Sequence, residues 1–171
     1  MEELKKRVSI CMSNLFEQDF HLIREDLHER TISSTLAYYL KHVFPSYNVD
    51  CEYNGNIDNQ YRRKAVNMYL QGRQIKFDEN VHSVYPDIII HKRGRNDKNR
   101  LLIEIKKSTN RYSNFDKEKL VFFTHPERNT EYLYDYGCFV KIFTGNANMK
   151  RYSITWYHEG QIIRQKEIFN L

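Results

Sequence analysis

The sequence has no long hydrophobic run, and none of its apolar stretches approaches the roughly 20 residues that a membrane-spanning helix requires. Glycine and proline are scarce, with six and three residues among 171, and no linker, repeat or low-complexity tract divides the chain. These absences argue against a membrane-spanning protein and against several domains. We expect one soluble domain over residues 1–171, large enough to bury a sizeable core.

Cysteine is also rare. The three cysteines, Cys11, Cys51 and Cys138, are odd in number, lie far apart and lack the spacing of metal ligands. No apolar segment typical of a secretory signal precedes them. The pattern predicts reduced thiols in a cytoplasmic protein.

The charge balance is only slightly basic. Lysine and arginine number 27 against 22 acidic residues, which gives a formal net charge of +5 and a pI near 9.0. This excess suits a polyanionic partner such as nucleic acid, although proteins that bind no polyanion often carry as much. No helix-turn-helix or zinc-finger pattern is present, so charge alone leaves the partner open.

The segment of residues 86–107 is the most informative part of the chain. It reads PDIIIH, then a basic polar interruption that includes Gly94, then LLIEIKK. Two apolar runs rich in branched side chains, joined by a loop of this composition, predict a pair of adjacent antiparallel strands.

Charged residues interrupt both predicted strands. Asp87 opens the first strand, and Glu104 and Lys106 lie two residues apart in the second. Because side chains alternate across a sheet, Glu104 and Lys106 share one face, while Ile103 and Ile105 share the other. Burying carboxylates and an ammonium group among isoleucines is costly unless they pair or bind a cation. We therefore expect the Asp87 and Glu104 carboxylates to converge on a functional site.

The same charged residues suit metal-dependent hydrolysis of a phosphodiester. The carboxylates of Asp87 and Glu104 are oxygen ligands of the kind that Mg²⁺ prefers, and the backbone carbonyl of Ile105 is a natural third ligand. The cation would acidify a bound water, while Lys106 would orient that water or stabilise the charge that builds up on the phosphate. Mn²⁺ can take the place of Mg²⁺.

These residues resemble the PD-(D/E)XK nuclease superfamily, whose members have the restriction-endonuclease-like fold. Pro86-Asp87 matches the first motif of the family, and Glu104-Ile105-Lys106 matches the second. The resemblance implies metal ligation by Asp87 and Glu104 and a catalytic role for Lys106. It also implies an α/β fold with a central mixed β-sheet flanked by α-helices.

A predicted helix upstream offers a fourth site residue. Apolar residues recur every three or four positions between Ile32 and Val43, which predicts an amphipathic helix over residues 25–44. Glu29 extends the buried stripe of this helix. In the nuclease superfamily, a helix before the first core strand often supplies one more acidic residue. The resemblance gives that role to Glu29, which would bind the metal directly or through water.

Each of these residues also has a structural explanation when it is taken singly. Asp87 can cap a turn after Pro86, and Glu104 and Lys106 can belong to the polar face of a half-exposed strand. Glu29 can be a first-turn glutamate favoured by the helix dipole. The combination favours a nuclease-like site, because all four residues fit one chemistry.

Basic residues near the predicted site are candidate contacts to nucleic acid. Two lie in the loop between the predicted strands, two follow the second strand, and one lies on the next predicted helix: Arg93, Arg95, Lys107, Arg111 and Lys119. A loop tip is usually solvated, so ordinary exposure stays an equal explanation for the loop residues. The tyrosines between positions 132 and 136 could stack on unpaired bases, but core packing is the commoner use of such residues and is the one we expect.

The remaining patterns complete a mixed sheet with helices on its faces. Helices are predicted over residues 2–20 and 115–124, and strands over 47–53, 137–144, 152–157 and 161–169, with a turn at Glu159-Gly160 between the last two. Residues 54–85 show no clear pattern and are interpreted as an insertion between strands.

The function predicted from these observations is a metal-dependent phosphodiesterase acting on nucleic acid, most simply a DNA endonuclease. One alternative is a nucleic-acid-binding module that keeps the fold without cleaving. Another is a protein-interaction or structural subunit whose charges form a solvated face. A short chain that cuts both strands of a duplex needs two active sites, so we also expect a homodimer.

Overall fold

The computed structural model describes residues 1–53, 68–70, 73–75, 85–110, 114–128, 132–146 and 149–171. The helices in these ranges are α1 (Glu2–Gln18), α2 (Phe20–Arg24), α3 (Glu29–Val43) and α4 (Asn114–Thr124). The strands are β1 (Asn48–Cys51), β2 (Met68–Leu70), β3 (Arg73–Ile75), β4 (Ile88–His91), β5 (Leu101–Lys107), β6 (Tyr136–Ile142), β7 (Arg151–His158) and β8 (Gln161–Asn170). Most of the predicted insertion at 54–85 lies outside the described residues.

Six of the strands form one mixed sheet in the order β1-β4-β5-β6-β7-β8. β5 and β6 are parallel, whereas the other neighbours in this sheet are antiparallel. β2 and β3 form a separate antiparallel pair. The parallel pair needs a crossover connection, and α4 lies in it between β5 and β6. The predicted α/β class, the mixed sheet and the antiparallel pairing of β4 with β5 are confirmed.

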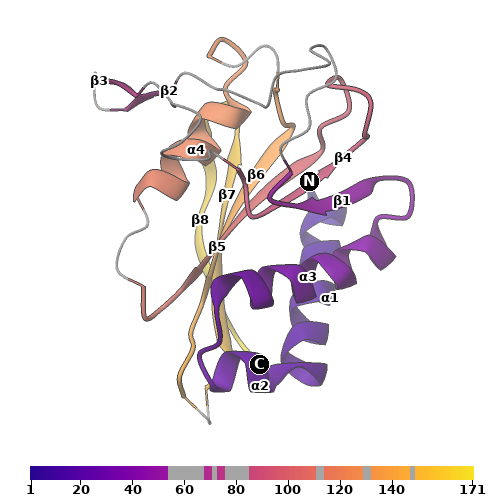
Figure 1. The fold of residues 1–171 in the computed structure, drawn as a ribbon, viewed down its shortest axis with the longest axis vertical. Coiled ribbons are helices and arrows are strands. Elements are labelled where there is room, and N and C mark those ends of the chain that lie inside the picture. The colour runs from indigo at the N-terminus through magenta and orange to yellow at the C-terminus, as the bar shows by residue number, and fades with distance from the viewer. Residues whose placement is uncertain (54–67, 71–72, 76–84, 111–113, 129–131, 147–148) are drawn as a thin grey trace.

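Helices cover both faces of this sheet (Figure 1). α1, α2 and α3 lie on one face, where Ile103 and Ile105 of β5 join their buried core. α4 covers the other face, where Leu102 packs in a second cluster that also holds Tyr132 and Tyr134. The alternation predicted for β5 is therefore confirmed, and these two tyrosines serve core packing. Glu104 and Lys106 belong to the α4 face.

α3 begins at Glu29, four residues later than the predicted start at Glu25. The difference arises at Asp26, whose φ of 53° lies in the left-handed region and interrupts a continuous helix. His28 then caps the new helix, because its side chain accepts a 3.2 Å hydrogen bond from the amide of Arg30. This start places Glu29 in the first turn of α3, at the end of the helix that meets the sheet.

α4 lies close to the sheet because β6 carries no side chain at Gly137. A Cβ atom at that position would lie 2.9 Å from Leu120 Cδ2 and 3.2 Å from Thr124 Cγ2. Glycine therefore sets the depth at which α4 packs. The same packing brings the start of α4 over the face that carries Glu104.

The other predicted elements differ from the observed ones only at their ends. Glu159 and Gly160 both have positive φ and form the predicted turn between β7 and β8. Over the part of the chain that the structure describes, no helix has both the length and the apolar character to cross a bilayer.

Candidate active site

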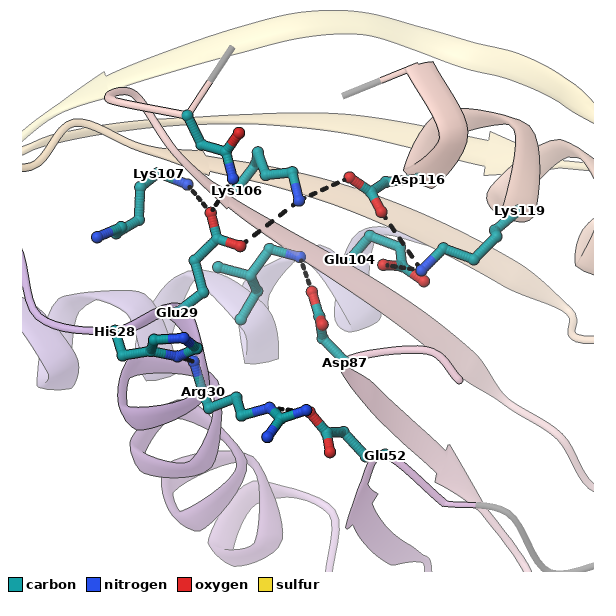
Figure 2. A network of polar contacts seen from close by, with 12 residues as sticks. His28, Glu29, Arg30, Glu52, Asp87, Glu104, Lys106, Lys107, Asp116 and Lys119 are labelled. Carbon is teal, nitrogen blue, oxygen red and sulfur yellow. Dashed lines mark hydrogen bonds and ion pairs between the residues drawn. The ribbon is translucent and has the colours of Figure 1, made fainter. Parts of the chain in front are cut away.

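Asp87 and Glu104 lie opposite each other on adjacent chain segments. Ile88 of β4 pairs with Ile103 of β5, and this antiparallel register places Asp87, one residue before β4, across from Glu104. Asp87 Oδ2 accepts a 2.7 Å hydrogen bond from the backbone amide of Ile105. The structure therefore brings the two carboxylates expected to act as ligands to one place on the sheet (Figure 2).

Glu104 is almost fully enclosed. Its side chain is 1% exposed, and its Oε2 lies 2.7 Å from Lys119 Nζ. Its other oxygen, Oε1, is buried and has no hydrogen-bond partner in the described structure. An unpaired buried carboxylate oxygen is costly to keep in a folded protein. A cation ligated by Oε1 would remove that cost, so the residues present fit a metal ion.

Burial raises the pKa of Glu104 well above its ordinary value, against the opposing charge of Lys119, and the charges of Asp87 and Asp116 raise it further. Burial also raises the pKa of Asp87, partly offset by the hydrogen bond from the Ile105 amide. The Asp87 carboxylate is therefore near enough to disfavour the ionised form of Glu104. A divalent cation is the partner that stabilises two such carboxylates together.

Lys106 Nζ lies between two carboxylates, 3.0 Å from Asp116 Oδ2 and 3.5 Å from Glu29 Oε2 (Figure 2). Burial lowers the pKa of Lys106, but the hydrogen bond and charge of Asp116, with the charges of Glu29 and Asp87, outweigh burial and raise it. Lys106 therefore stays protonated at neutral pH. In this state it can donate hydrogen bonds and neutralise negative charge, but it cannot act as a base.

Glu29 ties the start of α3 to the end of β5. Its Oε1 accepts hydrogen bonds from the Lys107 amide at 3.1 Å and from Asn110 Nδ2 at 3.3 Å. Its Oε2 faces Lys106. The structure thus brings Glu29 to the predicted site, where it contacts the lysine and the backbone of β5.

Asp116 of α4 is a site residue that the sequence motifs do not predict. It lies 3.0 Å from Lys106 Nζ through Oδ2 and 3.3 Å from Lys119 Nζ through Oδ1, so it bridges the two lysines. Asp116 and Lys119 share the buried face of α4 with Leu120 and Phe123. Two opposite charges three residues apart on the apolar stripe of a predicted helix are a sequence signal for such a buried ion pair.

The five residues predicted to contact nucleic acid differ in their surroundings. Lys119 is 5% exposed and is held by Glu104. Three others each have an acidic partner: Arg93 pairs with Asp50, Arg95 with Asp97, and Lys107 with Asp26. The side chains of Arg93 and Arg95 are nevertheless more than half exposed. Arg111 lies outside the described residues.

The donor set at this site is small. Within the described ranges, no three Asp, Glu, His or Cys side chains are grouped so that they could hold a metal ion. Asp87 and Glu104 therefore form a carboxylate pair, and further ligands would have to come from backbone carbonyls, water or substrate. This set suits Mg²⁺, which usually keeps several waters and takes only one or two carboxylates.

Four separate segments contribute to the site: the start of α3, the residue before β4, the middle of β5 and the start of α4. Together they place a carboxylate pair beside two lysines and a bridging aspartate. Comparisons with protein-family models, with curated proteins and with solved structures find no match to this chain.

Proposed function

We propose that this chain is a metal-dependent nuclease of the PD-(D/E)XK type, with a restriction-endonuclease-like fold, that hydrolyses phosphodiester bonds in DNA. One observation carries the proposal. Asp87, one residue before β4, lies across from Glu104 of β5 in the backbone register, and Glu104 keeps a buried oxygen without a donor among the described residues. A buried carboxylate with an unpaired oxygen, beside a second, half-buried carboxylate, favours a bound cation over a purely structural role.

The residues that would hold Mg²⁺ are Asp87, Glu104 and the backbone carbonyl of Ile105, with Glu29 acting through a bound water. Mn²⁺ can serve in place of Mg²⁺. When bound, the metal supplies an acidified water and offsets the charge that builds up on the phosphate. The phosphate and the remaining waters would complete its coordination.

Lys106 acts on the reacting phosphate. Hydrolysis adds the oxygen of water to phosphorus and breaks one P–O ester bond, and the proton lost by the water ends on the departing oxygen. Lys106 is protonated, so it can donate a hydrogen bond to a phosphate oxygen and stabilise the negative charge of the transition state. Glu29 and Asp116 hold its ammonium group in place from two sides.

The test is cleavage of supercoiled, linear, single-stranded and branched DNA in Mg²⁺ and in Mn²⁺. Asp87→Ala and Glu104→Ala should each abolish cleavage and weaken metal binding measured by calorimetry. Asp97→Ala is the matched control, because Asp97 is an exposed carboxylate of the loop between β4 and β5. Cleavage that survives Asp87→Ala would belong to a contaminant. If the wild type cleaves none of these substrates, the nuclease proposal is replaced by a nucleic-acid-binding module.

We further propose a homodimer as the form that cuts duplex DNA, because two active sites are needed for two strands. Sedimentation or light scattering of the protein with and without a short duplex tests this. A monomeric mass under both conditions, together with double-strand cleavage, would contradict the dimer.

A further inference from the structure

Charges of opposite sign alternate through the candidate active site. Glu29 contacts Lys106, Lys106 contacts Asp116, Asp116 contacts Lys119, and Lys119 contacts Glu104. The four N···O distances are 3.5, 3.0, 3.3 and 2.7 Å in that order. Figure 2 shows this series running from α3 across β5 to α4. A group that gains or loses an ion-pair partner at one end of the series therefore alters the electrostatic balance of the groups at the other end.

The series has more negative than positive groups. With Asp87, four carboxylates face the two ammonium groups of Lys106 and Lys119. The ionised site therefore carries two negative charges in excess, which is the charge that one divalent cation balances.

Lys119 lies where it interferes with that cation. Its ammonium group is 2.7 Å from Oε2 of Glu104, the carboxylate whose Oε1 is buried and unpaired. Lys119 is 5% exposed, so solvent screens its charge poorly. An ammonium group and a divalent cation on the same buried carboxylate repel strongly, and the weaker-bound group has to move.

We propose that Lys119 is the counter-ion of Glu104 in the metal-free protein and transfers to Asp116 when a divalent cation binds at Asp87 and Glu104. This inference rests on the proposed function. Asp116 Oδ1 already lies 3.3 Å from Lys119 Nζ, so the transfer needs only a change of side-chain rotamer. Lys119 is then a positioning residue rather than a contact to substrate phosphate.

The transfer also affects Lys106. Asp116 holds Lys106 through Oδ2 and Lys119 through Oδ1. When Lys119 pairs with Asp116 alone, its positive charge offsets more of the Asp116 carboxylate. The attraction of Asp116 for Lys106 then weakens. Lys106 then turns more readily toward a bound phosphate. Metal binding at Asp87 and Glu104 is thereby coupled to the orientation of the catalytic lysine.

The test measures Mn²⁺ and Mg²⁺ binding by calorimetry, without nucleic acid, at a pH near 8. Lys119→Met should bind either ion more tightly than the wild type, on the order of tenfold or more, because it removes a buried positive charge beside the site. Lys119→Arg keeps the charge and should bind like the wild type. Lys117→Met is the matched control on the exposed side of α4 and should also bind like the wild type.

Thermal unfolding gives a second readout. Lys119→Met should unfold at a lower temperature than the wild type without metal, and saturating Mn²⁺ should raise its unfolding midpoint by more than it raises that of the wild type. If Lys119→Met does not fold, Lys119→Gln provides the same comparison with a smaller loss of polar contacts.

Two results would overturn the inference in distinguishable ways. Equal or weaker metal binding by Lys119→Met and Lys119→Gln, with binding still abolished by Asp87→Ala, would overturn the counter-ion role and leave the nuclease proposal standing. Lys119 would then be either a contact to substrate phosphate or a partner in a purely structural ion pair. Absence of metal binding by the wild type and by every variant would overturn both proposals.

Discussion

Lys106 Nζ lies 3.0 Å from Asp116 Oδ2, so a residue of α4 holds the lysine of the second motif. Asp116 thereby becomes part of the environment that decides what Lys106 can do. The hydrogen bond keeps Lys106 protonated and directs it to the face of β5 that also carries Glu104. A charged, oriented ammonium group is suited to stabilise an anionic transition state.

Lys106→Met should abolish DNA cleavage and leave metal binding nearly unchanged. In the proposed mechanism Lys106 neutralises charge on the phosphate and does not ligate the metal, so its loss should reduce the rate on the order of 10²- to 10³-fold or more. Single-turnover cleavage and Mn²⁺ calorimetry measure the two effects separately. Lys98→Met, in the exposed loop, is the control and should alter neither. Loss of metal binding in Lys106→Met would contradict this division of roles.

Glu29→Ala should be milder than the substitutions of Asp87 and Glu104. It removes the carboxylate that accepts from the Lys107 amide and from Asn110, and we expect a loss of about 1 kcal/mol in the free energy of unfolding. Cleavage should fall but persist. Glu29→Gln keeps an oxygen acceptor and should recover most of the stability in denaturant unfolding. Complete loss of activity in both variants would make Glu29 an essential ligand instead.

Glu104 should make stability depend on pH. Its pKa in the folded protein is raised well above the ordinary value of 4.5, so the folded state keeps a proton that the unfolded chain has lost. The free energy of unfolding of the metal-free protein should therefore fall as pH rises from about 4.5 through the raised pKa. The Glu104→Gln variant should lack the part of the pH dependence that Glu104 contributes. The part that Asp87 contributes should remain, because the pKa of Asp87 is also raised. Identical pH slopes for the two proteins in chelator would contradict the expectation.

Gly137→Ala should destabilise the protein by about 1–3 kcal/mol, because the added methyl group overpacks the contact between β6 and α4. The new Cβ would meet Leu120 Cδ2 at 2.9 Å and Tyr157 Cβ at 3.3 Å. We also expect weaker metal-dependent stabilisation, since a displaced α4 carries Asp116 and Lys119 with it. Thermal unfolding with and without Mn²⁺ measures both effects. An unchanged unfolding midpoint would mean that α4 adjusts without cost.

Most of the β5 side of the site was predictable from the sequence. The spacing of Glu104 and Lys106 determines that they share a face, because side chains alternate along any strand. The apolar runs on both sides of the loop predicted the pairing of β4 with β5, and the structure has that pairing. The start of α3 was less predictable, since the left-handed φ of Asp26 is not visible in a periodic pattern.

The amino-acid sequence specifies which residues are available and, through local periodicity, which faces of the strands and helices they occupy. Two relationships arise from packing between elements: Asp116 bridges Lys106 and Lys119, and Lys119 is buried against Glu104. These contacts join residues of β5 to residues of α4, and the lack of a side chain at Gly137 leaves room for α4 to pack closely on the sheet. Local backbone geometry specifies the elements, whereas the partners of each charge depend on packing between elements that are distant along the chain.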